Sequence, residues 1–118
     1  MIAHIILFEP RAELGARELQ DVLDSFTSAT ATTRGLRNVR IGCRIKHGLP
    51  GYEQQMRQNF EYVAIIEFDD AAALREYLQH PAHAAAGRHF TESAASALAY
   101  DYALVGVEEA ATLVSKKA

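Results

Sequence analysis

The sequence predicts one α+β domain whose elements follow the order β-α-β-β-α-β, with an antiparallel sheet and the helices on one of its faces. Two observations predict this class. Short apolar or alternating runs, typical of strands, lie on either side of two amphipathic helical stretches. The chain has 118 residues, of which 49% are hydrophobic and 23% charged, as in one ordinary globular domain.

The first half of the chain predicts a strand, a helix and a second strand. Residues 2–8 form an apolar run that Pro10 stops. Residues 15–30 predict a helix because their apolar side chains recur at helical spacing. These side chains are Leu19, Val22, Leu23 and Phe26. Residues 39–46 alternate between apolar and charged or small residues, which indicates a half-exposed strand near an edge of the sheet.

The second half predicts a long loop, the strongest strand, a helix interrupted by a proline and a last strand. The expected bounds are 48–59 for the loop, 60–68 for the strand, 70–79 and 81–96 for the helical segments, and 98–105 for the last strand. Asp69 or Asp70 is a suitable N-cap for the first helical segment. Pro81 ends that segment and suits the first turn of the next one.

This order of elements is that of the ferredoxin-like fold. It divides the chain into a domain of residues 1–105 and a C-terminal tail of residues 106–118. The tail is weakly patterned, so we expect a loose tail or an appended arm.

Both faces of the central strands are apolar. On the first strand, Ile5 and Leu7 point away from the face that carries Ile6 and Phe8. Two helices can cover only one face, and burying an aliphatic side chain is worth about 1.5–3 kcal/mol. We therefore expect the other face to meet a second copy of the chain. The sequence thus predicts a homodimer that pairs sheet against sheet, in the manner of a dimeric α/β barrel.

Composition and charge argue against several classes of function. The net charge of −3 and the pI near 5.9 do not favour nucleic acid or a membrane surface, both of which attract basic proteins. No apolar run approaches the ~20 residues of a membrane span. The sequence has no Gly-rich phosphate loop, so no cofactor is expected. The single Cys43 and a first segment without signal-peptide features favour a reducing compartment, with the cytoplasm as the default.

Three polar side chains are expected to converge between the sheet and the helices. Strand parity places His4 on the face expected to be covered, and helical spacing turns Tyr77 and His83 inward. An imidazole is the usual general base near neutral pH, and a tyrosine hydroxyl can donate to a developing enolate or oxyanion. His83 and Tyr77 are therefore the candidate catalytic residues for proton abstraction next to a carbonyl. The residues expected to line the substrate site are His4, Ile6, Phe8, Tyr62 and Phe90.

Plainer roles compete with this hypothesis. A histidine near a helix start often satisfies backbone donors, and a buried tyrosine hydroxyl usually finds one partner. His80 and His83 stand three apart, but a proline between them and the lack of an adjacent carboxylate or cysteine argue against a metal site, even with His89 as a third ligand. Cys43 falls on the apolar side of its alternating strand, which favours packing over nucleophilic catalysis.

Three segments of the chain are similar to a known family. With HIILF at the start, YVAIIEFDDAAALREYLQHPAH in the middle and AYDY near the end, the sequence resembles the stress-responsive A/B barrel (Dabb) family over about residues 2–105. The resemblance implies a ferredoxin-like unit that pairs through its sheets into a dimeric barrel. Most of the family has no assigned reaction.

One characterised branch of this family, the olivetolic acid cyclases of plants, closes a linear polyketide by aldol condensation without a cofactor. The resemblance implies that His83 and Tyr77 correspond to the histidine and tyrosine of that branch, and His4 to a pocket-lining position. The alanine-rich stretch after His83, the loop of residues 48–60 and the C-terminal tail depart from the branch, so the resemblance does not imply a polyketide substrate.

Three functions stay open at this point. The first is binding of a small apolar or aromatic metabolite in a pocket between sheet and helices, with His4, Tyr77 and His83 as polar contacts. The second is a cofactor-independent cyclase, lyase or isomerase acting on a polyketide-like carbonyl substrate, with His83 as base and Tyr77 as its partner. The third is a structural dimer whose histidines only cap and pack.

Overall fold

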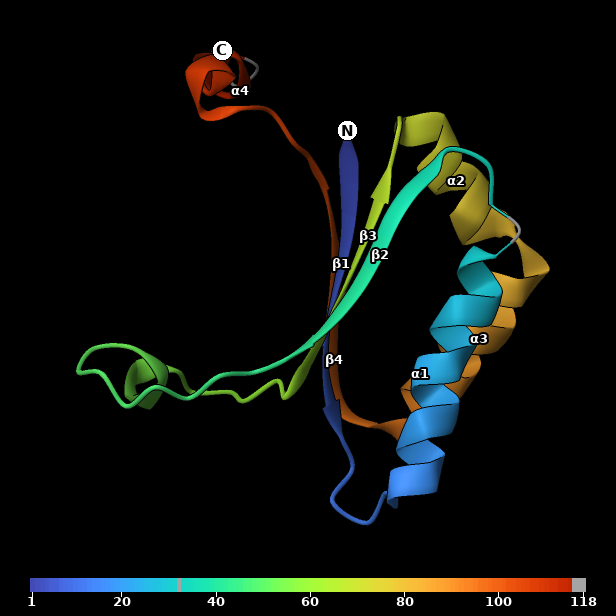
Figure 1. The fold of residues 1–118 in the computed structure, drawn as a ribbon, viewed down its shortest axis with the longest axis vertical. Coiled ribbons are helices and arrows are strands. Elements are labelled where there is room, and N and C mark those ends of the chain that lie inside the picture. The colour runs from blue at the N-terminus through green and yellow to red at the C-terminus, as the bar shows by residue number, and fades with distance from the viewer. Residues whose placement is uncertain (32, 116–118) are drawn as a thin grey trace.

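The computed structural model describes residues 1–31 and 33–115 (Figure 1). Its elements are β1 (Ile2–Pro10), α1 (Ala16–Thr30), β2 (Leu36–Cys43), β3 (Tyr62–Phe68), α2 (Ala71–Gln79), α3 (Pro81–Ser93), β4 (Ala94–Ala103) and α4 (Ala111–Ser115), with 3-10 turns at Glu53–Gln55 and Val107–Glu109. Within these residues the strands form one antiparallel sheet in the order β2-β3-β1-β4. The predicted ferredoxin-like α+β fold is confirmed. No helix in this part of the chain has the length and apolar character that a membrane crossing requires.

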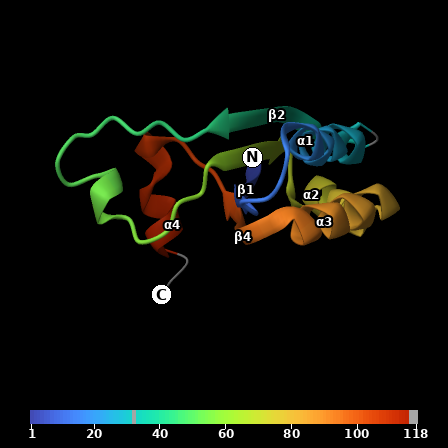
Figure 2. The same ribbon diagram turned by 90° about the horizontal axis from the view of Figure 1, so that it is seen from below.

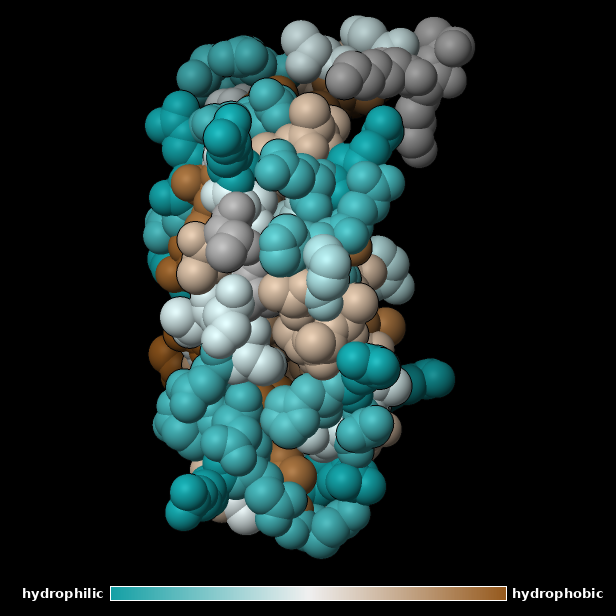
Figure 3. All heavy atoms as spheres, turned by 90° about the vertical axis from the view of Figure 1, so that its right-hand side faces the viewer, coloured by the Kyte–Doolittle hydropathy of each residue, from teal (hydrophilic) through white to brown (hydrophobic). Residues whose placement is uncertain are grey.

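The helices α1, α2 and α3 lie together on one face of the sheet (Figures 1 and 2). The covered face carries the even-numbered side chains of β1 and β3, because Ile6 pairs with Ala64 and Phe8 with Tyr62. The core beneath the helices consists of one cluster around Ile66, Phe68 and Tyr77 and another around Ile6, Phe8, Val22 and Phe26. The outer surface of the helix layer is mainly hydrophilic (Figure 3), so the helices are amphipathic as the sequence predicts.

Gly35 turns the chain into β2 beside the start of α2. Its φ of 75° lies in the left-handed region, and its carbonyl accepts the N–H of Asp69 at 2.8 Å. A Cβ at this position would lie 2.7 Å from the Cβ of Ala73, so only glycine allows this close approach. Pairing therefore begins at Leu36, before the expected residue 39. It ends at Cys43, opposite the first residue of β3, and the prediction that the strand runs to residue 46 is wrong.

The corner between α3 and β4 lies earlier than expected. The sequence predicts a helix to residue 96, but α3 ends at Ser93, and that prediction is wrong. The last residues of β1 draw the chain into the sheet, because Glu9 pairs with Ser96 and Pro10, after a register shift, with Ala94. Arg11 N–H then donates to the carbonyl of Ser93 at 3.0 Å. Ladder hydrogen bonds thus outweigh the helix propensity of this alanine-rich stretch.

Cys43 differs from its expected packing role. It stands at the end of β2, which is an edge strand as predicted, and its side chain is exposed. Its Sγ lies 3.2 Å from Oε1 of Glu61, and this hydrogen bond is the main cause that raises the pKa of the Cys43 thiol. The interpretation of Cys43 as a packed residue is therefore wrong, because the strand outruns the helix layer at this end. A raised pKa also disfavours the thiolate that a nucleophile needs.

The face of the sheet without helices carries a broad apolar surface. Ile5 pairs with Tyr100 and Leu7 with Leu98, so that neighbouring strands place large side chains side by side. Tyr100 is 53% exposed, and Ile5 and Leu7 are half-buried. We call this surface, with its further members Val63, Ile65 and Tyr102, the open face.

Two segments extend beyond the open face, from opposite ends of the sheet (Figures 1 and 2). One is the 44–61 loop between β2 and β3, and the other is the C-terminal arm, residues 104–115. The radius of gyration is 16.0 Å, whereas a compact chain of this length has about 13.5 Å. The difference is consistent with segments that project from the domain.

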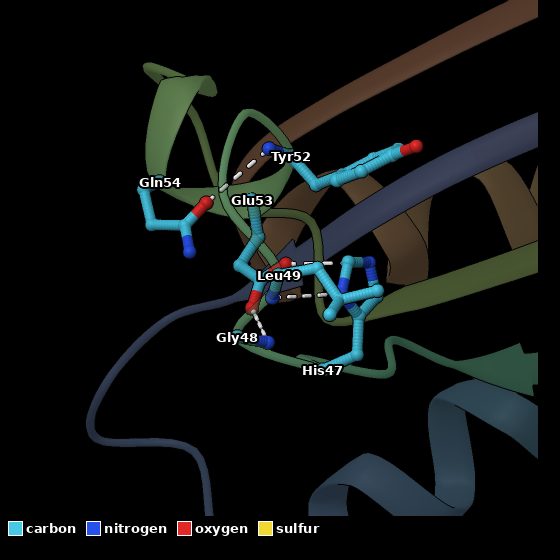
Figure 4. Close-up of polar contacts among 6 residues, drawn as sticks. All are labelled: His47, Gly48, Leu49, Tyr52, Glu53 and Gln54. Atoms are coloured by element: carbon cyan, nitrogen blue, oxygen red, sulfur yellow. Dashed lines mark hydrogen bonds and ion pairs between the residues drawn. The ribbon is translucent and has the colours of Figure 1, made fainter.

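Side chains within the 44–61 loop hold it in a defined shape (Figure 4). One carboxylate oxygen of Glu53 accepts the N–H of Gly48, and the other lies 3.4 Å from Nε2 of His47. Nδ1 of His47 accepts the N–H of Leu49 at 3.1 Å. Gly48 and Gly51 adopt positive φ values of 76° and 88°. These bonds give the loop a fixed path without regular secondary structure.

We predict that the N-cap of α2 contributes measurably to stability. Asp70 accepts the N–H of Ala73 at 2.9 Å, so Asp70→Ala should lower the free energy of unfolding by about 1 kcal/mol. Asp24→Ala, at an exposed position within α1, is the matched control and should change it by less than about 0.5 kcal/mol. Urea unfolding at one fixed protein concentration measures both. Equal effects of the two substitutions would contradict the cap.

Candidate functional site

A cavity of about 260 Å³ lies between the sheet and the helices. Its polar side chains are His4 from β1, Tyr77 from α2 and His83 from α3. Its apolar wall includes Ile6, Phe26, Leu78, Ala86, Phe90 and Ala99. A mostly apolar wall with a few convergent polar groups is the usual character of a small-molecule site.

Two capped helix starts position Tyr77 and His83. Asp70 begins α2, and Tyr77 follows two turns later on its inner side, with 1% of its surface exposed. His80 ends α2 and caps α3, since its Nδ1 accepts the N–H of Ala82 at 3.0 Å. Pro81 occupies the first position of α3, which suits its fixed φ, and His83 comes two residues later. The break between the helices thus turns both side chains into the same space.

The three rings lie in mutual edge contact. The ring centroids of Tyr77 and His83 are 4.7 Å apart, and those of His4 and Tyr77 are 5.8 Å apart. His4 and His83 are separated by 6.4 Å. On its other side, Tyr77 packs against Phe68 at 5.3 Å. Edge-to-face contacts of this kind hold aromatic rings in fixed orientations.

Asp101 is a polar partner that the sequence reading did not identify. It lies on β4 directly opposite His4, and its Oδ1 is 2.5 Å from Nδ1 of His4. Its side chain is 41% exposed, whereas that of His4 is 6% exposed. A carboxylate on one nitrogen of an imidazole fixes the orientation of the ring. The signal that could have found it is the alternation in AYDY, which places an acid between two tyrosines on the opposite side of the strand.

Burial sets the protonation of Tyr77 and His83. Desolvation raises the pKa of Tyr77 to about 12, so its hydroxyl keeps its proton and acts as a donor. Desolvation also lowers the pKa of His83, and electrostatic repulsion between the two imidazoles of His4 and His83 lowers it further, while a backbone hydrogen bond with Leu78 opposes both. At neutral pH the cavity therefore holds a neutral imidazole beside a neutral phenol. This pair can accept one proton and donate one hydrogen bond.

The structure brings together most of the side chains singled out from the sequence. His4, Ile6 and Phe90 line the cavity together with Tyr77 and His83. Phe8 and Tyr62 do not line it. Phe8 lies behind the wall, with its ring centroid 4.8 Å from that of Phe90, and Tyr62 lies beyond Phe8 at 6.4 Å. Phe26, Leu78 and Ala99 line the cavity but could not be chosen without the packing of α1, α2 and β4.

His80, the first histidine of the HPAH motif, lies at the junction of α2 and α3. His80 uses Nδ1 as the cap of α3. In residues 1–31 and 33–115, no group of three or more histidine, cysteine, aspartate or glutamate side chains is placed to hold a metal ion.

A second, larger hollow of about 600 Å³ lies at the base of the 44–61 loop. We call it the loop hollow. Leu7 and Val63 of the open face form part of its wall, and Met56, Phe60 and Arg57 of the loop form another part. It is separate from the cavity that contains His4, Tyr77 and His83, because the two share none of their lining residues.

Several solved structures have a similar fold. A dimeric ferredoxin-like protein of unknown function from Thermobifida fusca is 22% identical, with 87% of this chain and 90% of that chain covered and a TM-score of 0.69. A dimeric protein of unknown function from Bacteroides fragilis, also ferredoxin-like, is 26% identical, with 87% and 95% covered and a TM-score of 0.61. The hydroxynitrile lyase of Passiflora edulis is 9% identical, with 90% and 94% covered and a TM-score of 0.77. None of the curated proteins compared with the chain matches it.

The family model described as the stress responsive A/B barrel domain matches residues 2–104. The match runs from the first residue of β1 to the residue after β4, and it includes every side chain that lines the cavity. It covers well over half of the chain and stops where the C-terminal arm begins. The chain therefore belongs to the stress-responsive A/B barrel (Dabb) family.

Proposed function

We propose that this protein binds a small aromatic or apolar carbonyl compound in the cavity between sheet and helices, and that it does so as a cytoplasmic homodimer. The observation that carries the proposal is the cavity of about 260 Å³ into which His4, Tyr77 and His83 converge. An apolar cavity of about 150 Å³ holds benzene. The larger volume here suits one aromatic ring with polar substituents.

The wall explains the choice of ligand class. Phe26 and Phe90 lie with their ring centroids 5.7 Å apart and, with Ile6, offer apolar surface to a ring. The Tyr77 hydroxyl is a donor for a carbonyl oxygen, and the neutral His83 is an acceptor for a ligand hydroxyl. Few polar groups at fixed positions orient a ligand, while apolar contacts supply most of the affinity.

The homodimer rests on the open face and on two similar structures. Ile5, Leu7 and Tyr100 lie on a sheet face that the helices of the chain do not cover. The proteins from Thermobifida fusca and Bacteroides fragilis are described as dimeric. The cytoplasm as compartment rests on the single exposed Cys43, since free thiols persist where the environment is reducing.

The role of Tyr77 predicts a specific loss of affinity for an aromatic ketone. With 4-hydroxyacetophenone as probe, Tyr77→Phe should raise Kd by roughly 2- to 10-fold, because one hydrogen bond contributes about 0.5–1.5 kcal/mol. Tyr62→Phe removes a hydroxyl outside the cavity and should leave Kd unchanged. Isothermal titration calorimetry measures the Kd of this probe for the unsubstituted protein and for the two variants. No binding to the unsubstituted protein, or an equal loss in Tyr62→Phe, would overturn the proposal.

The lowered pKa of His83 predicts a pH dependence of stability. Below the unfolded pKa of 6.5 and above the lowered folded pKa, the unfolded chain binds a proton at this residue and the folded chain does not. The contribution of the neutral His83 to the free energy of unfolding is thus fully present above pH 6.5. It is lost as the pH falls through the pKa of His83 in the folded chain.

Urea unfolding over about pH 5 to 8, at constant protein concentration, measures how steeply the free energy of unfolding rises with pH. His83→Gln should flatten the rise of the unfolding free energy with pH, and His89→Gln, on the same helix but outside the cavity, should keep it. A slope unchanged by His83→Gln would show that the site does not hold this imidazole neutral.

A second candidate function is a cofactor-independent lyase, cyclase or isomerase at the same site. The observation that favours it is the edge contact of Tyr77 and His83 at 4.7 Å, which joins a neutral base to a neutral donor. The likeness in fold to the Passiflora edulis hydroxynitrile lyase suggests a hydroxynitrile as the substrate to test.

Such a cleavage needs one residue that carries a proton and one that donates a hydrogen bond, and His83 and Tyr77 would fill these two roles. His83 takes the proton of the substrate hydroxyl while the C–C bond to the nitrile breaks and the oxygen becomes a carbonyl. Tyr77 donates a hydrogen bond to that oxygen as its charge changes. Cyanide leaves with the bonding electrons and takes up the proton that His83 releases, so His83 returns to its neutral form.

This second candidate predicts turnover of mandelonitrile to benzaldehyde and hydrogen cyanide. His83→Ala should lower kcat by at least about 100-fold, the scale of general-base catalysis. His89→Ala, also on α3 but outside the cavity, is the control and should retain the rate. Benzaldehyde release is followed by its absorbance. A rate no faster than buffer, or an unchanged rate in His83→Ala, excludes this reaction.

A further inference from the structure

The lining of the loop hollow suits the binding of a protein segment. Leu7, Met56 and Phe60 make part of its wall apolar, and Arg44 and Arg57 give it positive charge. Its one acidic side chain, Glu61, is engaged by Cys43 and Asn59. The hollow continues into the open face through Leu7 and Val63.

The C-terminal arm has complementary chemistry. Its apolar side chains lie in water, with Val107 91% and Val114 71% exposed. Its charged residues, within the described range 104–115, are Glu108 and Glu109. Val107 and Val114 are much more exposed than an ordered aliphatic side chain normally is. Within residues 1–31 and 33–115, the side chains of the arm beyond Leu104 are therefore left largely uncovered by the rest of the chain.

The arm and the loop leave the sheet at opposite ends. The 44–61 loop connects Cys43 to Tyr62, and Tyr62 pairs with Phe8 near the end of β1. The arm follows Ala103, which pairs with Ile2 at the start of β1. Both project on the side of the open face (Figures 1 and 2).

The direction of the two-fold axis decides which segments of the two copies come into contact. If two copies pair through their open faces about an axis perpendicular to the strands, the arm end of each copy lies over the loop end of the other. An axis parallel to the strands would bring arm against arm and loop against loop, so the glutamates of the arm would not lie over the arginines of the loop hollow. The perpendicular axis brings Glu108 and Glu109 over the arginines of the hollow, and opposite charges favour it.

We propose that the C-terminal arm of each copy docks into the loop hollow of the other, so that two equivalent clasps close the dimer. Val107 and Leu113 then contact the wall formed by Leu7, Met56 and Phe60, and Glu108 and Glu109 face Arg44 and Arg57. The hydrogen bond from the N–H of Gly48 to Glu53 and the 3.4 Å contact of Glu53 with His47 fix the shape of the loop before docking (Figure 4). This inference rests on the homodimer proposed above, but not on the ligand or the reaction.

Cross-linking between single-cysteine chains tests the clasp. In a Cys43→Ser background, one tagged chain carries Val107→Cys and the other, untagged, carries Met56→Cys. After subunit exchange, a short bis-maleimide should join the two chains into one tagged–untagged product. Ala72→Cys, exposed on α2 and remote from the open face, replaces Met56→Cys in the control and should give no product.

Each other outcome counts against the proposal. A product between two Val107→Cys chains would show that arms meet arms. Equal cross-linking to Ala72→Cys would show random contact. No product in a mixture that native mass spectrometry finds dimeric would overturn the clasp and leave the homodimer intact, whereas a monomeric mixture would overturn both.

A charge exchange provides a second readout that does not depend on cysteine placement. Arg57→Glu and Glu108→Arg, each alone, should raise the Kd of the dimer by about 2- to 30-fold, because each breaks an exposed ion pair in both clasps. The double variant should return to the Kd of the unsubstituted protein. Additive weakening in the double variant would contradict the proposed pairing.

Discussion

The central strands β1 and β3 are apolar on both of their faces, and this places a constraint on everything around them. Helices α1, α2 and α3 bury one face, on which Ile66 and Phe68 are fully excluded from water. The other face, with Ile5 and Tyr100, has no helix over it (Figure 1). A homodimer would bury this second apolar face. The proposed clasp between arm and loop would extend the same interface beyond the sheet.

The candidate site depends on how the helix layer is broken. An uninterrupted helix from Asp70 onward would carry its inner stripe along one line. Because His80 and Pro81 end α2 and start α3, the rings of Tyr77 and His83 meet above β1 instead. His4 lies beneath them with Asp101 on its Nδ1. The cavity at this place combines apolar walls with the side chains of Tyr77 and His83, which burial keeps neutral, and the proposed recognition of a carbonyl rests on this combination.

The local periodicity of the sequence is sufficient to predict much of the fold and most side chains of the candidate site. The alternation of β1 placed His4 with Ile6 on the covered face, and helical spacing turned Tyr77 and His83 inward, as the structure has them. The contact of His4 with Asp101 spans 97 positions of the sequence and depends on the register of β1 with β4, which no local pattern contains. The packed role that alternation predicts for Cys43 is wrong for a similar reason, because alternation does not reveal where the helix layer ends. The alanines after Ser93 follow the ladder of β1, not their own propensity.

The most direct test of the central claim, that a second copy covers the open face, is sedimentation equilibrium of the unsubstituted protein at micromolar concentration. The account predicts a mass twice the 13.0 kDa of one chain. A mass of a single chain over the whole concentration range would contradict it, because Ile5, Leu7 and Tyr100 would then lie in water without the partner that their burial requires.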